Sequence, residues 1–164
     1  MKRHRVWIIG VCAVFCIVFG IWYFKFAGHH VRLDASHVPK DFWGITFSKK
    51  YAEELGLDWR EAYLAMLDEL KIRSIRIPVY WDDIERTKDS FSFDDYDWML
   101  AEGSKRNVKF ILAVGRRLPR WPECHQPDWT KQLSSDAFTD EQLAMVSATI
   151  QHFAPDPSIR YWQL

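Results

Sequence analysis

The chain has 164 residues, enough for one domain or for part of a larger one. Its 22 basic and 22 acidic residues balance, so bulk electrostatics give no sign of nucleic-acid binding. Three cysteines form neither a metal pattern nor a disulfide framework. Nine tryptophans suit a sugar-stacking surface or a core, and composition alone does not choose between the two.

Residues 1–27 have the pattern of a membrane anchor. A basic start is followed by Val6 to Phe24, which carries no charge, and a spanning helix needs about 20 apolar residues. A cleaved signal peptide begins in the same way, but Lys25-Phe26-Ala27 puts a lysine where a small residue is needed for cleavage. The sequence therefore predicts an uncleaved single-pass anchor, with a cytoplasmic N-terminus and an exported globular part.

Residues 28–40 have the composition of a linker. His29, His30 and His37 lie here, but no cysteine or acidic residue shares a ligand spacing with them. We therefore expect no metal site in the linker.

The stretch around Arg76 has the pattern of a strand. Ile75, Ile77 and Val79 alternate with other residues at a period of two, and Pro78 is expected to mark the end of the strand. Arg76 is a cation among β-branched neighbours. It fits an ion pair at a sheet end, or a site residue near the carboxyl end of a strand, where α/β folds bind their ligands.

Similar patterns predict four strands separated by three helices. Capping boxes indicate helix starts at Asp58 and Thr139, and a third helix is expected to start at Asp94. Leu143, Val146, Ile150 and Phe153 are expected on the buried face of the last helix. The predicted strands are 42–48, 74–79, 108–114 and 159–164.

The order β-α-β-α-β-α-β predicts parallel βαβ units. No glycine-rich phosphate fingerprint follows any strand, which argues against a nucleotide cofactor. A closed (β/α)8 barrel needs about 250 residues, and residues 41–164 supply roughly half of that. Because an apolar final strand ending at Leu164 is an aggregation hazard, we expect a fragment or an interrupted reading frame.

Six segments, in this order and spacing, resemble the amino-terminal half of the large clan of retaining glycoside hydrolases with (β/α)8 barrels. The clan includes cellulases, mannanases and β-galactosidases. The resemblance runs from about Phe42 to Leu164 and implies an α/β fold, an incomplete barrel of about four strands preceded by one transmembrane helix. The segments are FWGITFS, IRIPVYWDDIE, FSFDDYDWML, VKFILAVG, LPRWPE and IRYWQL.

The resemblance also bears on catalysis. In the clan, strand four ends near an Asn-Glu whose Glu is the acid/base, and a nucleophilic Glu ends strand seven. Neither is present at a matching position, so no catalytic residue is assigned and the chain alone is expected to be inactive. Arg76 matches the arginine that hydrogen-bonds the nucleophile in relatives, where it would keep that carboxylate ionised. Asp82, Asp83 and Glu85 are not expected to be catalytic.

Aromatic residues after the strand ends are candidates for carbohydrate contacts. Trp81, Trp121 and Trp129 are expected to stack on sugar rings, with loop packing as the alternative. His125 is a candidate for bonding a sugar hydroxyl, or it is a surface histidine. Trp43 and Trp162 are expected in the barrel core.

Two functions follow from these expectations. The first is the amino-terminal half of a membrane-anchored glycosidase that acts on β-linked sugars. The second is a membrane-tethered protein that binds carbohydrate or serves as a scaffold without catalysis. A carbohydrate and the membrane are the expected partners, and the oligomeric state stays open.

Overall fold

A computed structural model of the chain describes residues 15–16, 18–19, 22–23, 43–118 and 124–164. The chain divides into two units, Met1–Val38 and Pro39–Leu164. The second unit contains the sheet and the helices that pack against it.

The sheet has four parallel strands that lie side by side in chain order. In doubly wound folds the strand order reverses at a switch point, whereas consecutive order with a helix between successive strands is the arrangement of a (β/α)8 barrel. Four consecutive strands therefore correspond to half of such a barrel. The strands are β1 (Ile45–Thr46), β2 (Ser74–Tyr80), β3 (Lys109–Gly115) and β4 (Ile159–Gln163).

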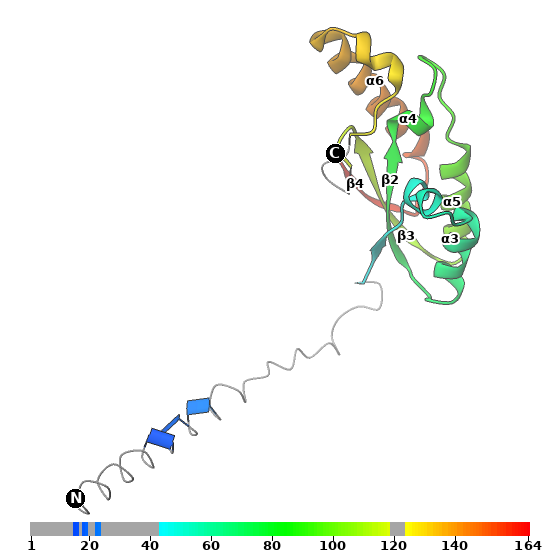
Figure 1. The fold of residues 1–164 in the computed structure, drawn as a ribbon. Coiled ribbons are helices and arrows are strands. Elements are labelled where there is room, and N and C mark those ends of the chain that lie inside the picture. Colours follow the sequence, from blue (N-terminus) through cyan, green and yellow to red (C-terminus); the bar gives the residue numbers. More distant parts are fainter. Residues whose placement is uncertain (1–14, 17, 20–21, 24–42, 119–123) are drawn as a thin grey trace, which may run out of the picture. The chain divides into compact units, whose positions relative to one another are not determined.

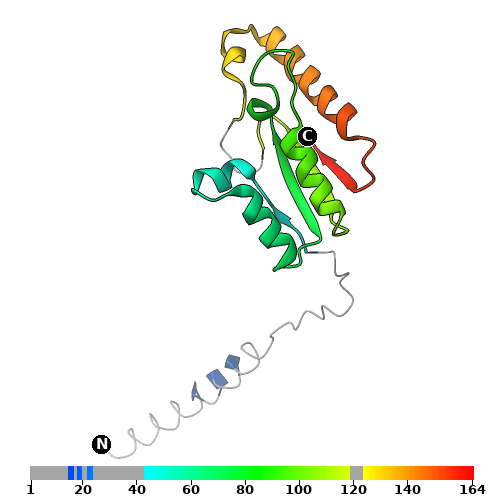
Figure 2. The ribbon, with the colours of Figure 1, turned by 90° about the vertical axis from the view of Figure 1, so that its right-hand side faces the viewer.

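Local capping fixes where several helices begin. The Ser48 side chain accepts from Tyr51 N at the first helix after β1, and the Asp58 side chain accepts from the amides of Arg60 and Glu61. Figures 1 and 2 show how the helices lie along the sheet. They are α2 (Lys49–Glu54), α3 (Trp59–Asp68), α4 (Trp81–Ile84), α5 (Asp94–Ser104), the 3-10 helix η2 (Asp128–Gln132) and α6 (Ser135–Phe153).

One face of the sheet packs against the helices and forms the main core. Its residues alternate along each strand, as the two-residue period of a strand requires. They lie in register across the sheet, and the central ones are at most 1% exposed. Examples are Ile75, Ile77, Phe110 and Leu112, which belong to the main core cluster.

The opposite face carries different residues, and we call it the open face. Thr46, Arg76, Ile111 and Tyr161 form one lateral row of it, because each pairs with the next across the four strands. None of these four belongs to the main core cluster. The next row toward the carboxyl ends of the strands is Pro78, Ala113 and Gln163.

The sheet confirms the predicted parallel α/β arrangement, but the membrane-spanning part of the predicted fold class is corrected. Within the described residues, no helix is long and apolar enough to cross a membrane. In the predicted span from Val6 to Phe24, the described helical residues are three pairs, at 15–16, 18–19 and 22–23, whereas a span needs about 20 consecutive residues. The rest of that span lies outside the described residues. The predicted single-pass membrane location is corrected on the same finding.

Two predicted boundaries are wrong for identifiable reasons. Pro78 was expected to end its strand, but β2 continues to Tyr80. Phe47 N donates to Arg76 O, so the backbone groups of Arg76 face β1. Residue 78 lies two positions further along β2, and its backbone nitrogen therefore faces β1 as well. Pairing with β1 has already ended there, and the missing proline N–H therefore breaks no ladder bond.

The N-cap of the last helix lies five residues before its predicted position. Ser134 caps α6 by accepting from Ala137 N, so the pattern at Thr139 lies inside the helix. The predicted buried face is confirmed at Phe153, and Val146 packs against the core cluster, but the prediction is wrong at Leu143, which is 59% exposed. Met145 and Thr149, which were not predicted to be buried, are buried.

Candidate functional site

Arg76 lies in the middle of β2 on the open face. Its Nε donates to Thr46 Oγ1 at 2.9 Å, and its Nη1 donates to Gln163 Oε1 at 3.2 Å. The guanidinium is thus held between β1 and β4, the two outer strands of the sheet. Among the described residues it forms no ion pair with an acid. Of the two interpretations open from the sequence, this geometry does not match an ion pair at a sheet end.

Tyr80 ends β2 on the same face, at the carboxyl ends of the strands. Its hydroxyl shares a 2.7 Å hydrogen bond with Ser48 Oγ, which follows β1. Its ring centroid lies 4.3 Å from that of His125, and Lys50 Nζ lies 5.5 Å from the ring centre. The segments that follow β1, β2 and β3 therefore meet around Tyr80, which is 2% exposed. We call this group the mouth of the half barrel: Ser48, Lys50, Tyr80, Asp82 and His125.

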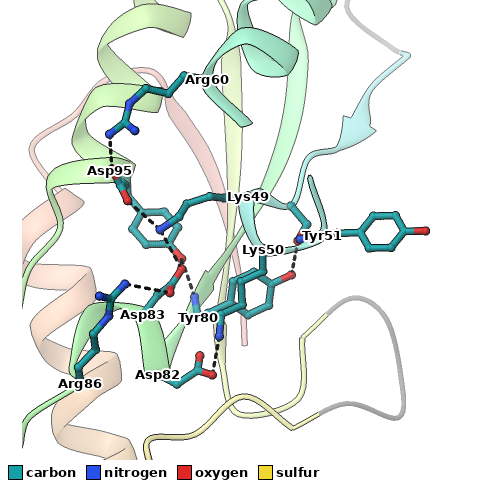
Figure 3. A network of polar contacts seen from close by, with 11 residues as sticks. Lys49, Lys50, Tyr51, Arg60, Tyr80, Asp82, Asp83, Arg86 and Asp95 are labelled. Atoms are coloured by element: carbon teal, nitrogen blue, oxygen red, sulfur yellow. Dashed lines mark hydrogen bonds and ion pairs between the residues drawn. The ribbon is translucent and has the colours of Figure 1, made fainter. Parts of the chain in front are cut away.

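A network of ion pairs lies beside the mouth, centred on Lys49 (Figure 3). Lys49 Nζ contacts Asp95 Oδ2 at 2.7 Å and Asp83 Oδ2 at 3.3 Å, although the lysine is only 6% exposed. Burial lowers the pKa of Lys49, but the hydrogen bond and charge of Asp95 and the charge of Asp83 outweigh it, so the pKa lies above its ordinary value. Arg60 extends the network, with Nη2 at 2.5 Å from Asp95 Oδ1.

Tyr96 connects this network to the end of β2. Its hydroxyl accepts from Tyr80 N at 3.1 Å and donates to Asp83 Oδ2 at 3.3 Å. Burial raises the pKa of Tyr96 well above its ordinary value, and the charge of Asp83 raises it further. The phenol therefore keeps the proton that it donates, and the carboxyl end of β2 is fixed to α5.

Trp81 does not present a face to a ligand, and its predicted role as a sugar platform is corrected. It is fully buried, its Nε1 donates to Glu85 Oε2 at 2.7 Å, and its ring packs edge-on against Trp129. The ring belongs to the main core cluster on the helix side of the sheet. Position after a strand end suggested exposure, but the short helix α4 turns the indole inward.

The other predicted carbohydrate contacts have different surroundings. Trp129 is half-buried, donates from Nε1 to Glu85 O at 3.1 Å, and has Lys88 Nζ 5.9 Å from its ring. His125 is half-buried at the mouth, and Trp121 lies outside the described residues. Arg76 and His125 thus come from the open face and its mouth, whereas Trp81 and Trp129 pack with each other. Trp43, which was expected in the core, is 70% exposed, and Trp162 packs against the core cluster.

The acids that follow β2 are engaged by other side chains. Asp82 Oδ2 lies 2.5 Å from Lys50 Nζ, Asp83 pairs with Lys49, and the buried Glu85 accepts from Trp81. Asp82 Oδ1 is buried and has no hydrogen-bond partner among the described residues. Within the described part of the chain, no three His, Cys, Asp or Glu side chains come together as a metal site.

Sequence reasoning missed the residues that hold Arg76 and Tyr80 in place. Thr46 and Gln163 carry no signal of their own in the sequence, and only the strand register brings them within reach of Arg76. Ser48 had a detectable signal, since a serine before a helical segment is a favoured N-cap. Its second bond, to Tyr80, depends on the pairing of β1 with β2.

No protein-family model and no curated protein matches the sequence. Solved structures do match the fold. GH5_18 from Streptomyces cattleya, in complex with GlcNAc, has a TM-score of 0.57 and 10% identity, over 74% of this chain and 32% of that chain. GH5_18 from Bifidobacterium longum subsp. longum has a TM-score of 0.54 and 15% identity over the same shares.

A beta-galactosidase from Bacillus circulans sp. alkalophilus has a TM-score of 0.52 and 15% identity, over 73% of this chain and 20% of that chain. This chain thus spans a third or less of the length of these structures. Identities this low concern the fold alone. The structural neighbours are glycoside hydrolases, and the chain shares with them the fold of part of a (β/α)8 TIM barrel, as the resemblance predicted.

Proposed function

We propose that the chain is the amino-terminal half of the barrel of a glycoside hydrolase. The intact protein would cleave β-linked O-glycosides with retention, and these 164 residues would supply one side of the sugar-binding mouth. The observation that carries the proposal is the placement of Arg76 on the open face, between Thr46 and Gln163 and without an acid partner among the described residues.

A guanidinium held in this way is suited to a carboxylate that faces the sheet. An opposite charge within about 4 to 6 Å lowers the pKa of a carboxyl group, and a charge-assisted hydrogen bond orients it. A retaining glycosidase needs such an ionised carboxylate as its nucleophile. Arg76 therefore supports a nucleophile supplied from outside these residues.

The same chemistry explains why the chain alone is expected to be inactive. Retention requires two carboxyl groups about 5 to 5.5 Å apart, one as nucleophile and one as acid/base. Each of the three acids after β2 is held by another group: Asp82 by Lys50, Asp83 by Lys49 and Glu85 by Trp81. None of them is available as half of a catalytic pair.

Carbohydrate is the substrate class that the mouth favours. Asp82 Oδ1 is a buried acceptor that no donor among the described residues reaches, and a buried polar atom needs a hydrogen bond. A sugar hydroxyl can supply one. Two structural neighbours support this class, since one GH5_18 structure contains GlcNAc and a variant of another contains Manb1-4GlcNAc.

The proposal is tested by assaying the 164-residue chain on aryl β-glycosides. We expect no turnover above that of a matched sample of heat-denatured protein. Turnover that disappears in Asp82→Asn or Glu85→Gln would show that the chain contains its own catalytic acids and would overturn the proposal. Because the chain would supply only one side of the sugar-binding mouth, we expect saturable sugar binding without turnover.

The nucleotide sequence after codon 164 provides a second test that separates catalysis from binding. Codons for Asn-Glu within three residues, with a later glutamate at a strand end, would support a hydrolase. A stop codon there would leave the alternative, a carbohydrate-binding protein without catalysis.

A further inference from the structure

We propose that a cavity beside the mouth binds one ring of a neutral sugar, as a second carbohydrate site separate from the open face. The cavity lies between the start of α2, α4, the loop of residues 85–93 and the start of α5. The described residues that line it fall within 49–96 and include no residue of the mouth. The choice of a sugar as the ligand rests on the proposed function, whereas the cavity itself does not depend on Arg76 or on the open face.

The size and lining of the cavity suit a small hydroxylated ring. Its volume is about 330 Å³, at the lower end of the range of about 300–1,000 Å³ for small-molecule sites, so it suits one sugar ring better than a longer ligand. Such sites are mostly apolar, but Ile84 is the only apolar residue among the described ones that line this cavity. An apolar ligand would leave the polar groups without hydrogen bonds, whereas a hydroxyl-rich one would satisfy them.

Lys49 and Asp83 form the buried part of the lining, with side chains 6% and 9% exposed. An ammonium group has three N–H donors. Lys49 directs two of them at Asp83 and Asp95, which leaves one without an oxygen acceptor among the described residues. Figure 3 shows the Asp83 carboxylate between Lys49 and Arg86.

The Asp83 carboxylate also keeps an acceptor. Its Oδ2 accepts from Lys49 and from Tyr96. Its Oδ1 lies 3.7 Å from Arg86 Nη2, which is too long for a hydrogen bond. A donor on Lys49 and an acceptor on Asp83 therefore lie side by side, which is the pair of groups that two neighbouring hydroxyls of a sugar require.

Two further hydroxyls lie at the exposed rim of the cavity. Ser90 N donates to Thr87 O at 3.1 Å, so one tight turn carries both side chains. Within the described residues, neither hydroxyl forms a hydrogen bond of its own. Because a hydroxyl both donates and accepts, each can meet a sugar hydroxyl in either role.

The charges around the cavity favour a neutral ligand. When the cation that pairs with Asp95 from outside the lining is included, three acids face three bases, so neither an anion nor a metal ion finds a surplus of opposite charge. The described residues also contain no cluster that could hold a metal. The acids are Asp83, Asp94 and Asp95, and the bases are Lys49, Arg86 and Arg60.

The mouth repeats the same chemistry one residue away. Lys50 pairs with Asp82 at the mouth, and Lys49 pairs with Asp83 in the cavity. Consecutive residues lie about 3.8 Å apart at their Cα atoms, so the two pairs are neighbours on both α2 and α4. A sugar in the cavity would therefore lie beside one at the mouth.

The test titrates the full chain with methyl β-D-mannopyranoside and methyl β-D-glucopyranoside and follows the NMR shifts of the backbone amides. We expect weak but saturable shifts at Thr87, Ser90 and Ser92, which line the cavity. Cyclohexanol, a ring of similar size with one hydroxyl, should produce none. Because these shifts are measured in the wild type, this part of the test does not depend on the folding of a variant.

A double variant removes the rim hydroxyls without touching the buried pair. Thr87→Val with Ser90→Ala, both at exposed positions, is expected to lower the affinity measured at the loop amides at least about fivefold. Thr139→Val with Ser104→Ala makes the same two changes at exposed positions outside the cavity and should leave that affinity unchanged. Equal affinity in the two double variants would overturn the proposal.

Arg76→Met separates the cavity from the mouth. The variant should keep the shifts at the loop amides and weaken those at the mouth. Loop shifts in a chain whose mouth binds no sugar would support the cavity site and count against the proposed function. Mouth binding without loop shifts, or loop shifts reproduced by sodium phosphate, would overturn the cavity site and leave the proposed function in place.

Discussion

Arg76 Nη1 donates to Gln163 Oε1 at 3.2 Å, although β3 lies between their two strands. In the register of the sheet Arg76 pairs with Ile111, and Gln163 pairs with Ala113 one row nearer the carboxyl ends. The side chain of Arg76 therefore crosses the open face diagonally. A cation held over a solvent-facing sheet surface contributes little to core packing. We therefore expect its removal to change the free energy of unfolding only slightly.

Arg76→Met is expected to lower the free energy of unfolding by less than about 1 kcal/mol, because the two hydrogen bonds that it removes are exposed. Arg73→Met, at the residue directly before β2, is the control. Arg73 Nη1 donates to Leu67 O and Ile72 O in a partly buried setting, and its loss is expected to cost about 1–2 kcal/mol. Urea unfolding measures the change in the free energy of unfolding for each of the two variants. A larger cost at Arg76 than at Arg73 would assign Arg76 a structural role.

Lys49→Met is expected to destabilise the fold by about 3 kcal/mol, because it leaves Asp83 and Asp95 without their shared cation. Lys50→Met is the control, since the Lys50–Asp82 pair is more exposed, at 23% and 27%, and its loss should cost less than about 1 kcal/mol. The midpoints of urea unfolding give the two values. Equal costs would contradict the buried role of Lys49.

The raised pKa of Lys49 gives this stabilisation a defined pH dependence. A group whose folded pKa lies above its unfolded value contributes fully below the unfolded value and loses its contribution as the pH rises through the folded pKa. The ordinary pKa is 10.5. The difference between wild type and Lys49→Met should therefore stay constant at neutral pH and shrink only above the ordinary lysine pKa. A difference that shrinks between pH 6 and about 8 would point to another titrating group.

Glu85→Ala is expected to cost about 2–3 kcal/mol, because it leaves the buried Trp81 Nε1 and the Asp89 N–H without their acceptors. Glu85→Gln keeps one acceptor oxygen and should cost less than the alanine variant. Thermal unfolding followed by near-UV circular dichroism reports both stability and the environment of Trp81. A glutamine variant as destabilised as the alanine variant would show that the carboxylate charge, rather than its hydrogen bonds, matters.

Gly103→Ala is expected to destabilise the fold by about 1–3 kcal/mol, although alanine favours helices. A Cβ at this position would collide with Phe110 Cζ and lie 3.1 Å from Tyr63 OH, where α5 packs against β3. The exposed neighbour Ser104 provides the control, because Ser104→Ala adds no atom to that contact and should be neutral or slightly stabilising. Neutral behaviour of Gly103→Ala would mean that Phe110 moves without cost.

The sequence predicted the parts of the fold that depend on local patterns. The alternation at Ile75, Ile77 and Val79 and the cap at Asp58 gave β2 and the start of α3. Asn107 follows α5 and has a φ of 59°, the left-handed conformation that asparagine favours after a helix. These features depend on residues close in sequence, so they could be read before the fold was known.

Features that depend on strand register or on packing could not be predicted in the same way. The burial of Trp81 follows from α4, a four-residue helix too short to leave a periodic pattern. The contacts of Arg76 with Thr46 and Gln163 join residues 30 and 87 positions away in sequence. Arg76 itself could be singled out because a cation breaks the apolar pattern of its strand.

The most direct test of the account is a titration of the 164-residue chain with Manβ1-4GlcNAc and other β-linked disaccharides, followed by NMR chemical shifts. We predict saturable shifts at the mouth and the open face. In the 164-residue chain, which lacks the proposed nucleophile, we expect the Arg76 guanidinium to donate to a sugar hydroxyl instead, so the affinity should fall at least about tenfold in Arg76→Met through loss of a charged hydrogen bond. Arg106→Met removes a cation that pairs with Asp68 and Glu102 and should leave the affinity unchanged. Absence of saturable binding for all of the sugars, or equal affinity in wild type and Arg76→Met, would contradict the account.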